Sequence, residues 1–262
     1  MIYSLMTGSA ELKKLLDAKA AMYNRRDFIA RDPICIPHSF TKRQDIEISG
    51  FFAATLAWGN RTTIINSCRR LMALMDNAPH EFIIGHKDTD LKPFLSFVHR
   101  TYNATDLLYF IAVLQRNYKE KTSLEDAFVP GTKYKEPTVE QALIRFHEYF
   151  FEGEHPERTR KHVATPARNS ACKRLNMYLR WMVRKDKSGV DFGIWKKISP
   201  AQLICPLDVH VARVAARLGM IPNDKADWKN ALLLTEQLRA MDAADPARYN
   251  FALFGLGAEE RL

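Results

Sequence analysis

A lysine and an aspartate, each at the predicted start of a basic helix, are the residues of this chain best placed to do chemistry. Lys173 lies in the segment SACKRLNMYLRWM of residues 170–182, and Asp208 lies in CPLDVHVARVAARLG of residues 205–219. A neutral lysine amine can attack a sugar carbon and form a Schiff base. A nearby carboxylate can accept a proton and stabilise the positive charge that develops on the sugar. In a basic protein this pair indicates covalent chemistry on DNA.

The helix that carries Lys173 is predicted to have a cationic face. At 100° per residue, Asn176, Arg180 and Arg184 fall on the same side as Lys173. Neighbouring cations disfavour a charged ammonium and so favour a nucleophilic amine. The alternative is an ordinary solvated face whose long side chains extend to water. The opposite side is apolar and is expected to pack against the core, through Leu175, Tyr178, Leu179 and Met182.

The segment that carries Asp208 has a structural interpretation beside the chemical one. Pro206 disfavours helix at the preceding residue, and aspartate is a favoured N-cap, so Asp208 is predicted to begin a helix. His210, Arg213 and Arg217 form the polar stripe of that helix. We expect His210 to contact phosphate or structure rather than a metal ion.

Charge is concentrated around these two residues. The chain of 262 residues has a net charge of +9, and residues 158–187 hold ten Lys or Arg against one acid, Asp186. Such clustering favours phosphate binding, with a solvated basic face as the alternative. The residues predicted to contact DNA are Arg168, Arg174, Arg180, Arg184, His210 and Arg213.

The cysteines and the hydropathy limit the other possibilities. Cys35, Cys68, Cys172 and Cys205 form no CxxC pair, so we expect no zinc or iron–sulfur site. The lysine–aspartate chemistry implies no metal or organic cofactor. Four separate thiols suit a reducing compartment. Residues 1–6 do not resemble a signal peptide, and no run of 18 apolar residues exists. These features predict a cytoplasmic protein with no membrane partner. We separately expect a monomer that is associated with the nucleoid when bound to DNA.

The hydrophobic periodicity predicts an all-α fold. No strand pattern is convincing, residues 119–137 read as a loop, and residues 152–169 read as an exposed connection. We expect one all-α unit of residues 1–262, with two helical lobes around a cleft, residues 45–150 and residues 1–44 plus 165–262. The predicted helices span residues 9–23 (with Ser9 as N-cap), 46–58, 62–75, 79–84, 106–118, 138–151, 170–185, 208–219, 226–240 and 246–256.

Four segments resemble the helix-hairpin-helix DNA glycosylase superfamily, which includes endonuclease III and the 8-oxoguanine glycosylases. ISGFFAATLAWGNRTT (48–63) resembles the family's early buried helix, KRLNMYL (173–179) the helix of the catalytic lysine, PLDVHVARV (206–214) the catalytic aspartate segment, and RYNFALFGLG (248–257) the closing helix. The motif CKRLNMYLRWMVRKD also resembles a bacterial family of conserved proteins of unknown function related to this superfamily. The resemblance implies a repair enzyme that excises a damaged base from DNA, with lyase activity if a Schiff base forms. The likeness of residues 206–221 to archaeal 8-oxoguanine glycosylases favours an oxidised purine.

The chain departs from the family's pattern in two places. The family's hairpin carries two glycines before the lysine, where this chain has Asn169 and Ala171. The separation of Lys173 from Asp208 is 35 residues, longer than in endonuclease III. Two points therefore need a structure: whether the segment before Lys173 can anchor on phosphate, and whether Lys173 lies close to Asp208.

A glycosylase must also hold an extruded base. Trp58 and Asn60 lie at the turn that matches the family's pocket region, where Trp58 would stack on the base and Asn60 would hydrogen bond to its edge. The alternative is that Trp58 is core and Gly59-Asn60 only interrupts the helices. Two further functions stay open: a DNA-binding protein that kept the fold but lost catalysis, and an unrelated all-α protein whose basic face binds RNA or a protein.

Overall fold

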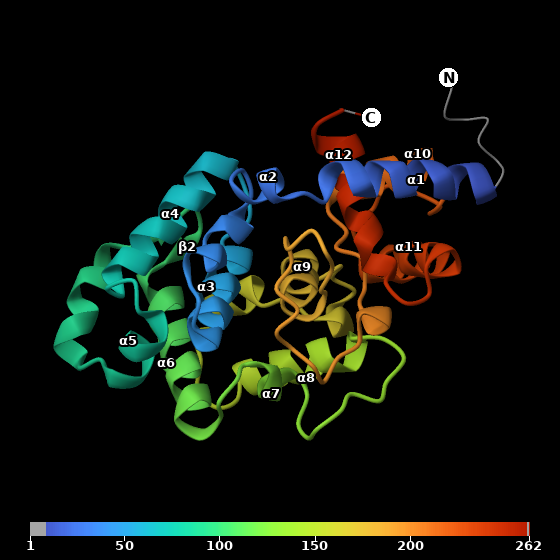
Figure 1. Ribbon diagram of the computed structural model, residues 1–262. Helices are drawn as coiled ribbons and strands as arrows, with labels where there is room; N and C mark the ends of the chain where they lie inside the picture. Colours follow the sequence, from blue (N-terminus) through green and yellow to red (C-terminus); the bar gives the residue numbers. More distant parts are fainter. Residues whose placement is uncertain (1–8, 261) are drawn as a thin grey trace. The chain divides into compact units, whose positions relative to one another are not determined.

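The computed structural model describes residues 9–260 and Leu262, so the predictions for residues 1–6 and for the Ser9 side chain lie outside the described residues. The chain divides into two compact units. Unit 1 consists of residues 1–28, 134–141 and 165–262, and unit 2 consists of residues 29–133 and 142–164. Each unit is predominantly helical, as the periodicity predicts (Figure 1).

Unit 2 holds the helices of residues 29–133 and 142–164, together with one short hairpin. Its α-helices are α3 (Arg43–Thr55), α4 (Arg61–Leu74), α5 (Pro79–Gly85), α6 (Ala104–Glu120), α7 (Glu125–Phe128) and most of α8 (Glu140–Phe150). Its 3₁₀ helices are η2 (Pro33–Cys35), η3 (Pro37–Ser39), η4 (Asp88–Ser96) and η5 (Glu157–His162), and its strands are β1 (Val98–His99) and β2 (Tyr102–Asn103).

An aromatic core joins the helices of unit 2. Phe51 of α3 stacks on Phe110 of α6 with ring centroids 5.5 Å apart, and meets Phe146 of α8 edge-on at 5.7 Å. All three rings are fully buried. Such pairs add to the free energy of burying the rings, so the apolar run of α3 acts as the centre of this unit.

Unit 1 is built on α9 and α12. Its helices are α1 (Ser9–Tyr23), α2 (Arg26–Ile29, at the boundary with unit 2), α9 (Lys173–Val183), α10 (Val209–Arg217), α11 (Trp228–Met241) and α12 (Asn250–Ala258), with 3₁₀ turns η6 (Pro166–Arg168), η7 (Pro200–Gln202) and η8 (Pro246–Tyr249). Helix α12 packs against both α1 and α10. A Cβ on Gly255 would lie 2.2 Å from the Tyr23 ring, and one on Gly257 would lie 3.0 Å from the carbonyl oxygen of His210. These two glycines let α12 approach its neighbours closely.

The structure corrects three of the fold predictions. Residues 98–103 form an antiparallel hairpin, which is too short to show an alternating pattern. Residues 152–169 are not simply an exposed connection, because Thr159 is fully buried and donates a hydrogen bond of 2.7 Å to Asp106. Residues 125–128, expected in a loop, form α7.

The division of the chain also differs from the predicted lobes. Residues 29–44 belong to unit 2, and residues 134–141 belong to unit 1. The second assignment follows from backbone hydrogen bonds of 2.9 Å, from Tyr134 N to Lys197 O and from Val139 N to Gln202 O. The expected cleft stays a prediction. Within the described residues, no helix has both the length and the apolar character needed to cross a membrane.

Candidate active site

Lys173 and Asp208 lie close together within unit 1. The Nζ of Lys173 is 3.9 Å from Oδ2 of Asp208, and the two side chains keep 28% and 20% of their surface exposed. Lys173 is the first residue of α9, and Asp208 is the N-cap of α10. The site therefore consists of two helix starts that bring an amine and a carboxylate together at a partly solvated position.

Asp208 uses its two carboxylate oxygens differently. Oδ1 accepts hydrogen bonds of 3.0 Å from the backbone N–H groups of both His210 and Val211. Oδ2 is the oxygen that faces the Lys173 amine. The capping role and the chemical role are thus compatible, because the cap fixes the carboxylate and leaves its other oxygen directed at the lysine.

The turn before Lys173 has the left-handed conformations that glycines usually supply. Asn169 has φ 54° and ψ 26°, and Cys172 has φ 48° and ψ 34°. Asparagine adopts this region more readily than other non-glycine residues. The second left-handed position is Cys172, one residue after Ala171.

The same turn is fastened to the start of α11. The carbonyl oxygen of Asn169 accepts a hydrogen bond of 3.1 Å from the backbone N–H of Trp228. The side-chain Oδ1 of Asn169 accepts one of 3.4 Å from the backbone N–H of Lys229. Ser170 forms an isolated antiparallel bridge with Asp227. These contacts tie the turn before Lys173 to the start of α11, so the backbone that leads into Lys173 is held by another helix.

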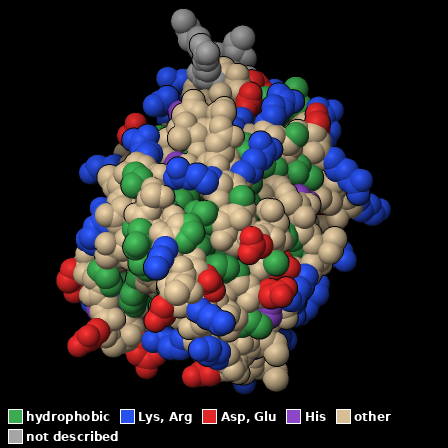
Figure 2. Space-filling model, turned by 90° about the vertical axis from the view of Figure 1, so that its left-hand side faces the viewer, with side chains coloured by type: hydrophobic (Ala, Val, Ile, Leu, Met, Phe, Trp, Pro, Cys, Tyr) green, Lys and Arg blue, Asp and Glu red, His purple; other side chains and the backbone are tan. Residues whose placement is uncertain are grey.

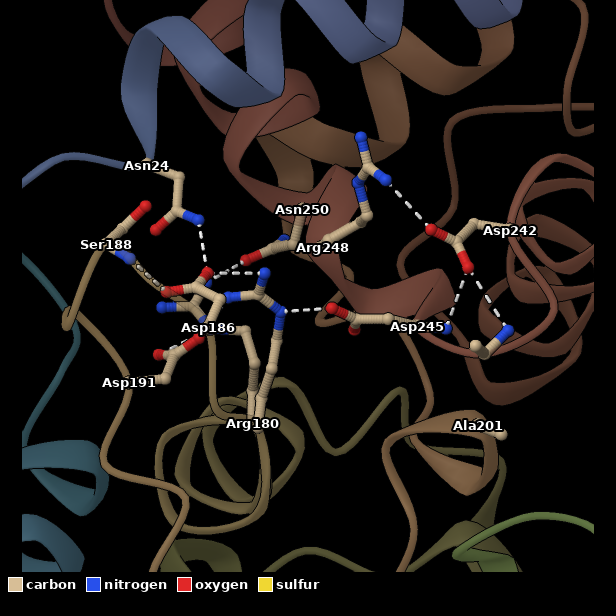
Figure 3. A network of polar contacts seen from close by, with 12 residues as sticks. Asn24, Arg180, Asp186, Ser188, Asp191, Ala201, Asp242, Asp245, Arg248 and Asn250 are labelled. Atoms are coloured by element: carbon tan, nitrogen blue, oxygen red, sulfur yellow. Dashed lines mark hydrogen bonds and ion pairs between the residues drawn. The ribbon is translucent and has the colours of Figure 1, made fainter.

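Arg180 and Arg184 do not form the cationic stripe that the helical wheel predicts. Both are buried, with 4% and 3% of their surface exposed, and each pairs with Asp191, at 3.3 Å and 2.9 Å. Arg184 also pairs with Asp186 at 2.7 Å and with Asp245 at 2.8 Å. Figure 3 shows these acids gathered around the arginine side chains. A buried, compensated arginine cannot serve as a phosphate contact on the surface, so this part of the prediction is wrong.

The electrostatic argument for Lys173 changes with this correction. Arg180 and Arg184 face three acids in the cluster, and Oδ2 of Asp208 lies 3.9 Å from the Lys173 amine. The charges of these two arginines are therefore compensated by acids, so they do not form the cationic surroundings that the helical wheel predicts for Lys173.

The other predicted DNA contacts differ in exposure. Arg168, His210 and Arg213 are exposed, and Arg174 is half-buried. Arg168 ends η6, directly before the hairpin, and His210 and Arg213 lie on α10. These residues of unit 1 flank the lysine–aspartate pair along the chain, and their contact with phosphate stays a prediction.

Trp58 and Asn60 belong to unit 2. Trp58 is half-buried, stacks on His162 with ring centroids 5.6 Å apart, and meets His99 edge-on at 5.1 Å. Asn60 caps α4 by accepting a hydrogen bond of 3.2 Å from the N–H of Thr63, and its side chain is exposed. Asn60 thus has a structural role at the start of α4, and the base-pocket role of both residues stays a prediction.

The sequence did not reveal the polar residues that surround Trp58. His162 lies 3.3 Å from Asp106, a fully buried acid, and Tyr102 meets the His162 ring edge-on at 4.9 Å. Burial lowers the pKa of His99. The four residues come from β1, β2, α6 and η5, so no local spacing could have indicated the cluster.

The view of the molecule from the side of α4 and α5 shows how charge is distributed on that face. Figure 2 shows Lys and Arg side chains interspersed with Asp and Glu, with hydrophobic side chains between them. The exposed hydrophobic residues of unit 2 are Ile84, Leu95 and Val98. On this face charges of both signs are mixed, so the net charge of the protein is not expressed there as a uniform basic surface.

The comparisons with known proteins identify a family. One family model matches residues 32–259, and its description reads "Protein of unknown function (DUF2400)". The chain belongs to the DUF2400 family. The matched residues include Lys173, Asp208 and the turn before Lys173. No curated protein and no solved structure matches the chain.

Proposed function

We propose that this DUF2400 protein is a DNA repair glycosylase with Lys173 as its nucleophile and Asp208 as the assisting carboxylate. The observation that carries the proposal is the 3.9 Å separation of Lys173 Nζ from Asp208 Oδ2, across 35 residues of sequence. The resemblance of both segments to the helix-hairpin-helix glycosylases supports it. The proposed partner is duplex DNA with a damaged base, and an oxidised purine is the favoured substrate.

The proposed reaction begins with transfer of a proton from the Lys173 ammonium to Asp208. The neutral amine then forms a bond to the sugar carbon while the bond from that carbon to the base breaks. The base leaves with the bonding electrons and takes up a proton. Asp208 passes the accepted proton to the departing base, so its carboxylate is again negative where positive charge develops on the sugar. Opening of the sugar ring gives a Schiff base, from which strand cleavage can follow.

Binding is proposed to rest on cations of unit 1 and on the turn before Lys173. Arg168, Arg174, His210 and Arg213 would contact phosphates and fix the orientation of the duplex without reading its sequence. Because phosphate contacts release counterions, binding should weaken steeply as the salt concentration rises.

The test is borohydride trapping on a panel of duplexes, each with one damaged base or an abasic site. We expect a covalent adduct with the wild-type protein that is lost in Lys173→Gln and strongly reduced in Asp208→Asn. The matched control is Lys187→Gln, which removes an equal charge from an exposed lysine of the same basic stretch.

Three other results would change the proposal. An adduct that persists in Lys173→Gln rules out this residue as the nucleophile. Release of free base without an adduct indicates a glycosylase that uses water. DNA binding with neither adduct nor free base, on every duplex, supports a binding protein without catalysis.

A further inference from the structure

Asn250, the first residue of α12, holds the chain just before Asp208. Its Nδ2 donates a hydrogen bond of 3.0 Å to the carbonyl oxygen of Pro206, and its Oδ1 accepts one of 2.6 Å from Nη1 of Arg180. Asn250 is 6% exposed. Figure 3 shows the Asn250 side chain beside the arginine cluster. One buried amide therefore connects the backbone two residues before Asp208 to a side chain of α9.

Arg180 is itself fixed in place. It pairs with Asp191 at 3.3 Å, and its Cζ lies 4.2 Å from the centroid of the Phe251 ring. Because Arg180 lies on the helix that begins with Lys173, its position is tied to that of the lysine. The chain of contacts from α9 through Arg180 and Asn250 to Pro206 spans the two elements that carry the proposed reacting residues.

A second contact holds the same segment from the other side. Thr235 of α11 accepts a hydrogen bond of 3.0 Å from the N–H of Cys205, and its hydroxyl donates one of 2.7 Å to Ala231 O. Residues 203–207 are all buried, and burial raises the pKa of Cys205 to about 12. The backbone that leads into Asp208 is thus fastened at consecutive residues, its N–H by Thr235 and its carbonyl by Asn250.

We propose that Asn250 is a positioning residue for the lysine–aspartate pair: it sets the separation of Lys173 Nζ and Asp208 Oδ2 without touching either group. The inference rests on the proposed function, because it concerns the rate of that reaction. An amide suits the position since it must donate to a carbonyl and accept from a guanidinium at once. Catalysis is sensitive to such placement, and a displacement of about 1 Å can reduce a rate about 100-fold.

The experiment compares Asn250→Asp with Asn230→Asp. The first variant keeps an acceptor for Arg180 but loses the donor to Pro206, so it disturbs the Asp208 segment selectively. Asn230 is a matched control, because it is 3% exposed and its Nδ2 donates to Lys225 O at 2.8 Å and to Asn223 Oδ1 at 2.9 Å. Both variants exchange a buried donor for a carboxylate, and of the two residues only Asn250 holds the segment that leads into Asp208.

The measured quantities are the borohydride-trapping rate at saturating DNA, the affinity for abasic duplex, and Tm. We expect Asn250→Asp to reduce the trapping rate at least about tenfold with affinity unchanged, and Asn230→Asp to keep the wild-type rate. Equal rates for wild type and a folded Asn250→Asp overturn the inference. An equal loss of rate in both variants overturns it too, since the effect is then merely structural. Absence of trapping by the wild type contradicts the proposed function itself, and the inference falls with it.

If Asn250→Asp does not fold, Thr235→Val takes its place. Valine keeps the shape of threonine and removes the acceptor for Cys205 N–H, so it loosens the same segment at its other contact. We expect a reduced trapping rate at unchanged affinity. A wild-type rate in folded Thr235→Val would show that fastening this segment does not control the pair.

Discussion

The carboxylate of Asp208 caps α10 with Oδ1 and faces the amine of Lys173 with Oδ2, 3.9 Å away. One side chain thus meets a structural demand and presents a charged oxygen to a potential nucleophile. The two roles can be separated by mutation, because asparagine caps a helix about as well as aspartate and carries no charge.

Asp208→Asn and Asp208→Ala should therefore differ in stability, while both should lose the carboxylate that the proposed reaction needs. We expect the asparagine variant to unfold within about 0.5 kcal/mol of wild type, since the cap is retained and only the favourable charge at the helix start is lost. The alanine variant should lose about 1 kcal/mol more, because two backbone N–H groups lose their acceptor. Urea unfolding measures both. Equal stability of the two variants would show that Oδ1 contributes little as a cap.

The turn before Lys173 gives a second prediction. Asn169 has φ 54° and its carbonyl and side chain hold the start of α11. Asn169→Gly relieves the left-handed backbone and loses one side-chain contact, so we expect a change within about 0.5 kcal/mol. Asn169→Ala loses the contact and meets a steric penalty of about 1–2 kcal/mol. Urea unfolding again distinguishes them, and an alanine variant as stable as the glycine variant would contradict the backbone argument.

The sequence predicted the helices well because each helix leaves a repeating pattern of apolar residues within its own segment. Residues 9–23 form α1 within the bounds expected, and the helices predicted at 62–75 and 106–118 correspond to α4 (Arg61–Leu74) and α6 (Ala104–Glu120). A cap residue marked the start of α10, where Asp208 is the N-cap as predicted. The assignment of residues 134–141 to unit 1 could not be predicted, because it depends on hydrogen bonds to residues more than 60 positions away.

The site was partly predictable for the same reason. Lys173 and Asp208 stood out because each begins a helix, and the structure brings them together. The surroundings of Arg180 and Arg184 were mispredicted, since a helical wheel shows only the charges of its own helix, and the partners Asp191 and Asp245 come from other segments. Asn250 was missed, although a polar residue at the start of the apolar segment NFALFGLGA is itself a signal of a buried polar contact.

The packing of α12 on α1 gives a third prediction. A Cβ at Gly255 would lie 2.2 Å from two ring atoms of Tyr23, whose hydroxyl donates a hydrogen bond of 2.6 Å to Glu260. Gly255→Ala should therefore destabilise the protein by about 1–3 kcal/mol through overpacking. Gly85→Ala is the control, because the added Cβ meets nothing within 4 Å. Thermal unfolding that lowers Tm equally in both variants would contradict the clash as the cause.

The acids around Arg184 give a prediction for the pH dependence of stability. Burial opposes ionisation of Asp186, but hydrogen bonds from Asn24 and the charge of Arg184 outweigh it and lower its pKa below 3.8. The unfolded chain then binds the proton more tightly. The ionised Asp186 side chain therefore stabilises the folded protein. This contribution to the free energy of unfolding is present above about pH 3.8 and is lost as the pH falls through the folded pKa. Asp186→Asn lacks it, so the stability advantage of wild type over this variant should shrink on acidification.

Asp245 should show the opposite slope. Burial raises its pKa above 3.8 despite the charge of Arg184, so the folded protein binds this proton more tightly than the unfolded chain does. Ionisation of Asp245 thus lowers stability as the pH rises from 3.8 through the folded pKa. The difference in unfolding free energy between wild type and Asp245→Asn should therefore move in wild type's favour on acidification. Urea unfolding from pH 3 to pH 6 measures both differences, and slopes of the same sign for the two variants would show that burial and ion pairing do not act on these acids in opposite directions.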